Sequence, residues 1–262
     1  YMGRDYVFRK WHQSQLTFSL MYAFTERFVL PFSHDEVVHG KRSLIDRMPG
    51  DIWRKFACLR AMLLYQITHP GAKLMFMGGE FGQFIEWRFA EQLEWFLLGY
   101  DSHRQLHDCV RDLNHYYRSH ASLWLQDDSW DGFSWLNADD STNSVFVYAR
   151  RAAGHPDLVV VLNLTPSPLQ HYILPVPPGG NWTVVFNTDD GRYGGSGFPT
   201  GVPADESAVA ADQGTPARLR LDLPPLCGLI LSRAAAAGQL RVADGNGATE
   251  NDHDAAAEGR PE

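Results

Sequence analysis

The sequence lacks the features that define several large classes of protein. It has only three cysteines in 262 residues, Cys58, Cys109 and Cys227, and this odd, widely spaced set argues against a disulfide framework. No apolar run is long enough to span a membrane, and 31 acids outweigh 23 lysines and arginines, which leaves no basic surface for nucleic acid. We therefore expect a soluble, cytoplasmic protein with neither membrane nor nucleic-acid partners.

Two common catalytic signatures are also missing. The chain contains no G-x-S-x-G, the strained elbow that presents a nucleophilic serine. His34 and His39 are five residues apart, so they do not share one helical face as the zinc ligands of H-E-x-x-H do. We therefore expect no hydrolytic triad, no metal site and no cofactor.

What is present divides the chain at about residue 125. Helical and strand patterns alternate in residues 1–124, which is typical of parallel βα units in an open sheet or a closed barrel. Two strands complete neither architecture, so the chain is expected to be a fragment of a longer protein. The expected elements are a substantially buried helix at 5–24, a buried strand at 28–32, a helix at 51–69 capped by Asp51, a buried strand at 73–77 and a helix at 103–119.

The second half has a different pattern. Seven short alternating runs separated by turn residues predict an all-β sandwich at 125–234. Residues 235–262 are rich in alanine, glycine and acids, with too few large apolar residues to fold, and predict a disordered tail. The expected strands lie near residues 132–136, 144–150, 158–164, 171–176, 182–187, 217–223 and 226–232.

Polar side chains follow both strands of the first half. His34 and Asp35 come directly after the first strand, and Glu80 follows the second. Sites of α/β proteins lie at the carboxyl ends of parallel strands, so these groups are expected on one side of the sheet. A turn whose charges merely face water is the alternative.

A family resemblance favours the functional alternative. The strings LPFSHDEVVHGKRSLIDRMPGD (30–51), KLMFMGGEFGQ (73–83) and IEWRFAEQLEW (85–95) resemble the end of the catalytic barrel in bacterial glycogen branching enzymes, members of the α-amylase superfamily. The resemblance extends over about residues 1–233. It implies the C-terminal part of a (β/α)8 barrel at 1–124, an α-1,4-glucan or glycogen substrate, and a full-length parent that is monomeric.

The resemblance also implies roles for single residues. Such enzymes cut an α-1,4 link by a retaining mechanism and re-form it as an α-1,6 branch; Asp35 matches the third carboxylate, which grips the sugar as positive charge develops. His34 matches the histidine that hydrogen-bonds the same sugar. Further residues are expected to line subsites, or else to pair among themselves and fix the loop: Glu36, His39 and Lys41. Glu80 is expected to brace the site, and Trp87 and Trp95 to stack on sugar or to pack on helices.

The other two carboxylates of the mechanism are expected upstream of Tyr1. Asp5 begins a helix instead of ending a strand, and Glu26 precedes its strand, so neither fits the nucleophile or the general acid. The isolated chain is therefore expected to be inactive. Two alternatives stay open: a glucan hydrolase of the same superfamily, and a non-catalytic glucan-binding module.

Overall fold

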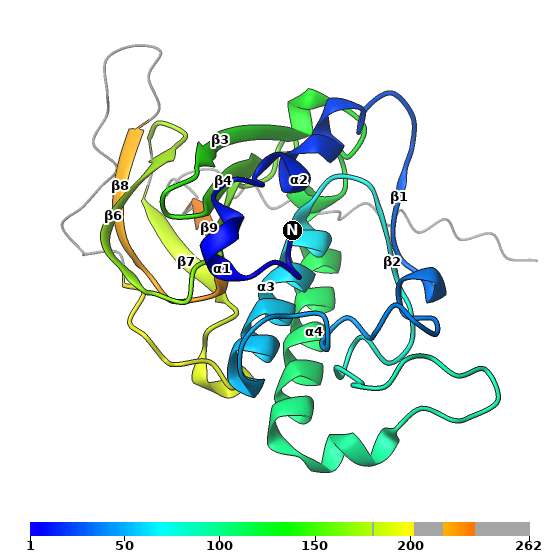
Figure 1. Ribbon diagram of the computed structural model, residues 1–262. Helices are drawn as coiled ribbons and strands as arrows, with labels where there is room; N and C mark the ends of the chain where they lie inside the picture. The colour runs from blue at the N-terminus through cyan, green and yellow to red at the C-terminus, as the bar shows by residue number, and fades with distance from the viewer. Residues whose placement is uncertain (180, 202–216, 234–262) are drawn as a thin grey trace, which may run out of the picture.

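The computed structural model describes residues 1–179, 181–201 and 217–233 (Figure 1). The tail predicted at 235–262 lies outside these residues. Helices and a small parallel sheet come first in the chain, and antiparallel strands follow. Within the described part, no helix is long and apolar enough to cross a bilayer.

The predicted βαβ unit is confirmed. Strand β1 (Val29–Phe32) pairs in parallel with β2 (Ala72–Met75), and helix α3 (Ile52–Thr68) connects them. The predicted cap is confirmed too, because the Asp51 carboxylate accepts a hydrogen bond from the Arg54 backbone N–H at 2.9 Å. Helix α4 (Asp101–Ser119) packs against α3.

The single buried helix predicted at 5–24 is wrong. The segment forms three short pieces, α1 (Tyr6–Arg9), α2 (Ser14–Thr17) and the 3₁₀ helix η1 (Phe18–Met21). Large apolar side chains such as Trp11 are exposed, whereas the guanidinium of Arg9 is fully buried. A buried guanidinium needs acceptors, and the chain turns so that the carbonyls of Met2 and Arg4 surround it.

The two parallel strands are also less buried than predicted. Both alternate between exposed and half-buried positions, with Val29 52% and Leu74 42% exposed. Within the described residues β1 and β2 pair only with each other, so one face and both outer edges stay uncovered.

All seven strands predicted in the second half are present, and they form two antiparallel sheets. One sheet has the order β3-β4-β5-β9-β7, and the other pairs β6 with β8. The strands are β3 (Phe133–Asp140), β4 (Val145–Arg150), β5 (Leu158–Asn163), β6 (Leu169–Val176), β7 (Trp182–Asn187), β8 (Ala217–Leu223) and β9 (Cys227–Arg233). Short 3₁₀ helices η2 (His34–Glu36), η3 (Trp95–Gly99), η4 (Ala121–Leu123), η5 (Trp130–Gly132) and η6 (Gly191–Tyr193) lie in the connections.

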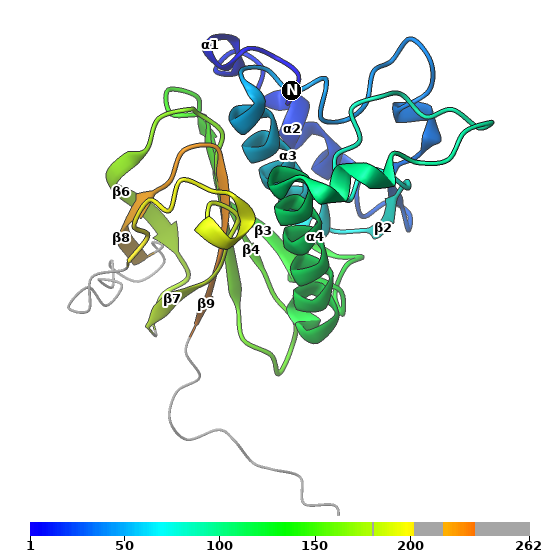
Figure 2. The ribbon, with the colours of Figure 1, turned by 90° about the horizontal axis from the view of Figure 1, so that it is seen from below.

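The five-stranded sheet is covered on both faces. Alternate residues of β4 point in opposite directions: Val145 and Val147 join the core shared with β6 and β8, while Phe146 and Tyr148 join the core formed with α3 and α4. Figure 2 shows the two helices between the large sheet and the β1–β2 pair. The helical and β regions thus share one core, and the boundary predicted near residue 125 stays a prediction.

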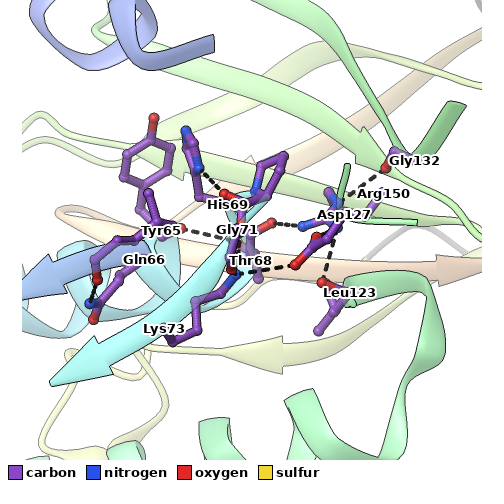
Figure 3. Close-up of polar contacts among 12 residues, drawn as sticks. Tyr65, Gln66, Thr68, His69, Gly71, Lys73, Leu123, Asp127, Gly132 and Arg150 are labelled. Atoms are coloured by element: carbon purple, nitrogen blue, oxygen red, sulfur yellow. Dashed lines mark hydrogen bonds and ion pairs between the residues drawn. The ribbon is translucent and has the colours of Figure 1, made fainter. Parts of the chain in front are cut away.

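Buried arginines connect the two regions. Arg150 on β4 is fully buried and donates to the carbonyl oxygens of Thr68 at the end of α3, Leu123 and Gly132 (Figure 3). It also hydrogen-bonds the Asp127 carboxylate. The charge therefore has acceptors from both regions at once, which a buried guanidinium requires.

The three cysteines behave as small buried hydrophobic residues. Cys58, Cys109 and Cys227 are free thiols with no exposed surface. Burial raises the pKa of the Cys109 thiol to about 12. Burial also raises the pKa of the Cys227 thiol well above its usual value. A thiol that stays protonated is a poor nucleophile, so neither Cys109 nor Cys227 marks a reactive site.

Candidate functional site

The carboxyl ends of β1 and β2 lie side by side. Phe32, the last residue of β1, pairs with Met75, and its carbonyl oxygen accepts the Phe76 N–H at 2.8 Å. The chain then leaves β1 through η2, and it leaves β2 through the loop that contains Glu80. Both polar segments therefore start from the same edge of the parallel pair. That the side chains of Asp35 and Glu80 lie on one side of the sheet stays a prediction.

Asp35 sits in the middle of a capped 3₁₀ turn. The Ser33 hydroxyl accepts the Asp35 N–H at 3.2 Å, and the Val37 N–H closes the turn on the His34 carbonyl at 2.9 Å. The side chain of Asp35 is 70% exposed, and one carboxylate oxygen lies 3.5 Å from His34 Nε2. The turn therefore presents a carboxylate and an imidazole together at the strand end.

Two aromatic rings hold the imidazole of His34. Its ring centroid lies 5.9 Å from Trp87 and 6.1 Å from Phe76, and these two rings meet edge to face at 5.1 Å. The backbone N–H of Trp87 also donates to the Val37 carbonyl at 2.8 Å. Trp87 thus joins the loop after β2 to the turn after β1.

Glu36 is engaged by Arg47. The Arg47 Nη1 donates to Glu36 Oε2 at 3.1 Å, and its Nη2 donates to the Glu36 carbonyl oxygen. Both side chains are partly shielded, with 28% of Arg47 and 43% of Glu36 exposed. The structure places Glu36 in an internal ion pair of the loop.

Glu86 ties down the far side of the same loop. Its Oε1 accepts the Arg42 backbone N–H at 2.7 Å, and its Oε2 lies 3.2 Å from His39 Nδ1. The Arg42 and Gly40 backbone N–H groups hold the pKa of the Glu86 carboxyl below its usual range. Arg42 has a φ of 63°, so the contact stabilises a left-handed turn that disfavours most side chains.

The spaces around the loop differ in size. Behind the turn, a cavity of about 20 Å³ lined by Phe32, Phe76 and Trp87 has room for roughly one water. A cleft of about 300 Å³ opens between the two loops, at the lower end of the range for ligand pockets. Its lining includes His39, Arg42, Asp46, Phe84, Glu86 and Trp87. His34 and Asp35 do not line this cleft; their side chains are 53% and 70% exposed beside it.

The remaining predicted residues lie at different places. Lys41 is exposed beside His39, and Glu80 is half-buried in the loop after β2. Trp95 packs against Phe81, with ring centroids 5.3 Å apart, but remains 52% exposed.

Glu26 lines a cavity at the amino ends of the strands, away from Asp35, as expected. Among the described residues, no three His, Cys, Asp or Glu side chains group closely enough to hold a metal.

Sequence reasoning missed the partners that shape the site. Ser33 next to the turn is a detectable cap signal, since a serine before a helical turn commonly accepts its N–H groups. Arg47 and Glu86 are 11 and 44 residues away from the groups they hold, and no local pattern indicates those pairs.

Known proteins are similar in sequence to most of this chain. The family described as "Alpha amylase, C-terminal all-beta domain" matches residues 135–234. Over 235 residues the chain is 49% identical to the 1,4-alpha-glucan branching enzyme GlgB of Pseudomonas aeruginosa, covering 89% of this chain and 32% of that enzyme. The enzyme of the same name from Halothermothrix orenii is 45% identical over 227 residues, covering 86% and 36%.

Solved structures support the fold. A pullulanase from Paenibacillus barengoltzii matches 74% of this chain and 28% of its own with a TM-score of 0.55 at 20% identity. The debranching enzyme of Nostoc punctiforme matches 78% and 35% with a TM-score of 0.51 at 17% identity. At such identities the likeness concerns the fold alone. Over most of its length the chain is thus similar in sequence to bacterial 1,4-alpha-glucan branching enzymes, and it spans about a third of the length of those it matches.

Proposed function

We propose that this chain is the segment of a 1,4-α-glucan branching enzyme that contributes one carboxylate to the active site. The observation that carries the proposal is the exposed His34–Asp35 pair at the shared carboxyl edge of β1 and β2, in a chain about half identical to such enzymes. The substrate would be an α-1,4-glucan such as glycogen. The product would carry an α-1,6 branch.

Asp35 would act on the sugar that becomes positively charged. In retaining glycosyl transfer the anomeric carbon passes through an oxocarbenium-like state, and a nearby carboxylate that grips the ring hydroxyls binds this state more tightly than the ground state. His34, 3.5 Å from Asp35, would donate a hydrogen bond to the same sugar. His39 and Trp87 would contact a neighbouring sugar in the cleft between the loops.

The nucleophile and the general acid would come from residues outside this chain. Asp5 serves as the N-cap of α1, and Glu26 lies at the opposite end of the parallel strands. In the same proposal, residues 1–124 form the last part of a (β/α)8 barrel. The full-length enzyme would be a cytoplasmic monomer that needs neither a metal nor a cofactor.

The test uses the full-length enzyme that contains this segment. Asp35→Asn keeps the shape but removes the charge, and turnover on amylose, followed by the loss of iodine staining, should fall by at least about 10²- to 10³-fold. The chain of residues 1–262 alone should give no branching. Near-normal turnover of the Asp35→Asn enzyme would contradict the proposed role.

The same assay distinguishes transfer from hydrolysis. A branching enzyme conserves the number of glycosidic bonds, so α-1,6 links should appear while reducing ends rise only slightly. Reducing ends that increase in step with the loss of iodine staining would instead indicate a glucan hydrolase. Glucan binding without any reaction, in the full-length protein, would indicate a binding module.

A further inference from the structure

We propose that Arg47 is a positioning residue that holds the Asp35 carboxylate in place through Glu36. This inference rests on the proposed function, because it concerns the same site. Arg47 donates through Nη1 to the Glu36 side chain and through Nη2 to the Glu36 carbonyl oxygen. One guanidinium therefore holds both the side chain and the main chain of the residue next to Asp35.

The turn around Asp35 needs such a contact. The 3₁₀ helix η2 has only three residues, and a helix this short gains too few internal hydrogen bonds to be stable alone. The Asp35 side chain is mostly in solvent, with His34 as its neighbour at 3.5 Å. Its position is therefore set by the backbone of the turn.

Contacts inside the turn and contacts from other segments both restrain that backbone. Inside the turn, the Ser33 hydroxyl accepts the Asp35 N–H, and the carbonyls of Ser33 and His34 accept the N–H groups of Glu36 and Val37. From outside, the backbone N–H of Trp87 donates to the Val37 carbonyl. The guanidinium of Arg47 is the second contact from another segment, and it acts at Glu36. Without Arg47, the turn would keep its internal hydrogen bonds and the Trp87 contact at its end, but Glu36 would lose its partner.

The contact between Arg47 and Glu36 is suited to orienting the turn more than to stabilising the fold. A partly exposed ion pair adds at most about 1 kcal/mol to folding. The planar guanidinium, however, forms two hydrogen bonds in fixed directions, which a lysine cannot reproduce. In this proposal Glu36 is the group through which Arg47 holds the turn, and not a sugar ligand. The alternative expected from the sequence, that Glu36, His39 and Lys41 pair among themselves, does not describe this contact, because the partner of Glu36 is Arg47.

The experiment is a double-mutant cycle in the full-length enzyme, with kcat and KM measured separately. Arg47→Gln should lower kcat by about 10- to 100-fold, the scale for small displacements of a reacting group, and should leave KM within about twofold. Arg47→Lys should fall between Arg47→Gln and the wild type. Glu36→Gln should add little to Arg47→Gln, because the bond from Arg47 to the Glu36 carboxylate is already absent once the guanidinium is removed. Arg104→Gln is the control, since Arg104 also pairs with a carboxylate, that of the nearby Asp101, but lies away from the turn and is 52% exposed.

Hydrogen exchange provides a readout independent of activity. In the full-length enzyme, Arg47→Gln should speed exchange of the amides of residues 35–37, whereas Arg104→Gln should not. Additive effects of Glu36→Gln and Arg47→Gln, or a raised KM for Glu36→Gln alone, would overturn the inference and make Glu36 a sugar ligand. If Arg47→Gln does not fold, Arg47→Lys decides, and wild-type kcat in that variant would overturn the inference. Normal turnover of Asp35→Asn would instead overturn the proposed function.

Discussion

Arg60 on α3 donates a hydrogen bond through Nε to the carbonyl oxygen of Thr188, at 2.8 Å, across the contact between the helices and the β-sandwich. Arg9 does the same to the carbonyl of Leu164, at 2.8 Å, and Arg150 reaches back from the sandwich to Thr68. All three guanidinium groups are almost completely buried. Each guanidinium has its full set of acceptors only when both regions are folded and in contact, so we expect the two regions to unfold together.

Removing Arg150 tests this coupling. Arg150→Met should lower the free energy of unfolding by about 3–5 kcal/mol, because it leaves buried carbonyls without a donor and Asp127 without its closest partner. Urea denaturation followed by circular dichroism measures the change. Arg151→Met is the matched control. Arg151 is the next residue in the chain, but its side chain is only half-buried and donates to the Ser134 hydroxyl. Equal losses for the two variants would contradict the role of Arg150.

His69 should make stability depend on pH. The ring is buried, with Nδ1 2.7 Å from the Pro70 carbonyl and Nε2 2.9 Å from the Ser19 hydroxyl, and burial lowers the pKa of His69 from 6.5 to about 4. Between pH 6.5 and about pH 4, the unfolded chain therefore binds a proton at His69 and the folded chain does not. The free energy of unfolding should fall by roughly 3 kcal/mol from this group as pH drops from 6.5 to 4.

Denaturation of the His69→Gln variant at several pH values measures that contribution. The difference in unfolding free energy between variant and wild type should shrink as pH falls from 6.5 towards 4. His155→Gln, at an exposed loop position, should leave the pH dependence unchanged. A difference that stays constant with pH for His69→Gln would show that His69 is not the group responsible.

Gly132 should not tolerate a side chain. A Cβ at this position would lie 1.7 Å from the backbone carbonyl oxygen of Gln126, and the Gly132 carbonyl is itself an acceptor for Arg150. Gly132→Ala should therefore destabilise the chain by about 3 kcal/mol, the upper end for overpacking. Gly99→Ala, where nothing lies within 4 Å, is the control for thermal denaturation. Similar melting temperatures for both variants would contradict the close approach.

Glu86 should protect its loop from proteolysis. It accepts the Arg42 N–H and contacts His39, and both Lys41 and Arg42 are exposed. Glu86→Ala should free this left-handed turn, so limited trypsin digestion should cut after residues 41 and 42 several-fold faster. Glu91→Ala, which breaks only the exposed pair with Arg88, should digest like the wild type. Unchanged cleavage in Glu86→Ala would show that other contacts hold the turn.

Local patterns in the sequence were enough for most elements but failed where partners are distant. The seven strands of the sandwich are predicted by the alternation of apolar and polar residues and by the turn residues between the runs. Helix α3 is predicted by its Asp51 cap and by apolar residues spaced three to four apart. The segment 5–24 was predicted as one helix because it lacks proline and glycine. Its true shape depends on burying Arg9 against the carbonyl of Leu164, 155 residues away.

The candidate site could likewise be predicted only in part from the sequence. The identity of His34 and Asp35, and their place after a strand, could be read from residue types and from the resemblance to a family. Their mutual geometry could not, because Arg47, Trp87 and Glu86 reach the loop from other segments.

By itself, the sequence determined which segments are strands, where polar chemistry follows them and to which family the chain is related. Periodicity, turn residues and motifs are local properties, so they survive without knowledge of the fold. Only the tertiary structure decided that the helices cover one face of the five-stranded sheet, that buried arginines join the two regions, and that Glu36 pairs with Arg47. These contacts are directional hydrogen bonds and buried charges between distant residues, and their free energy exists only once the chain has brought them together.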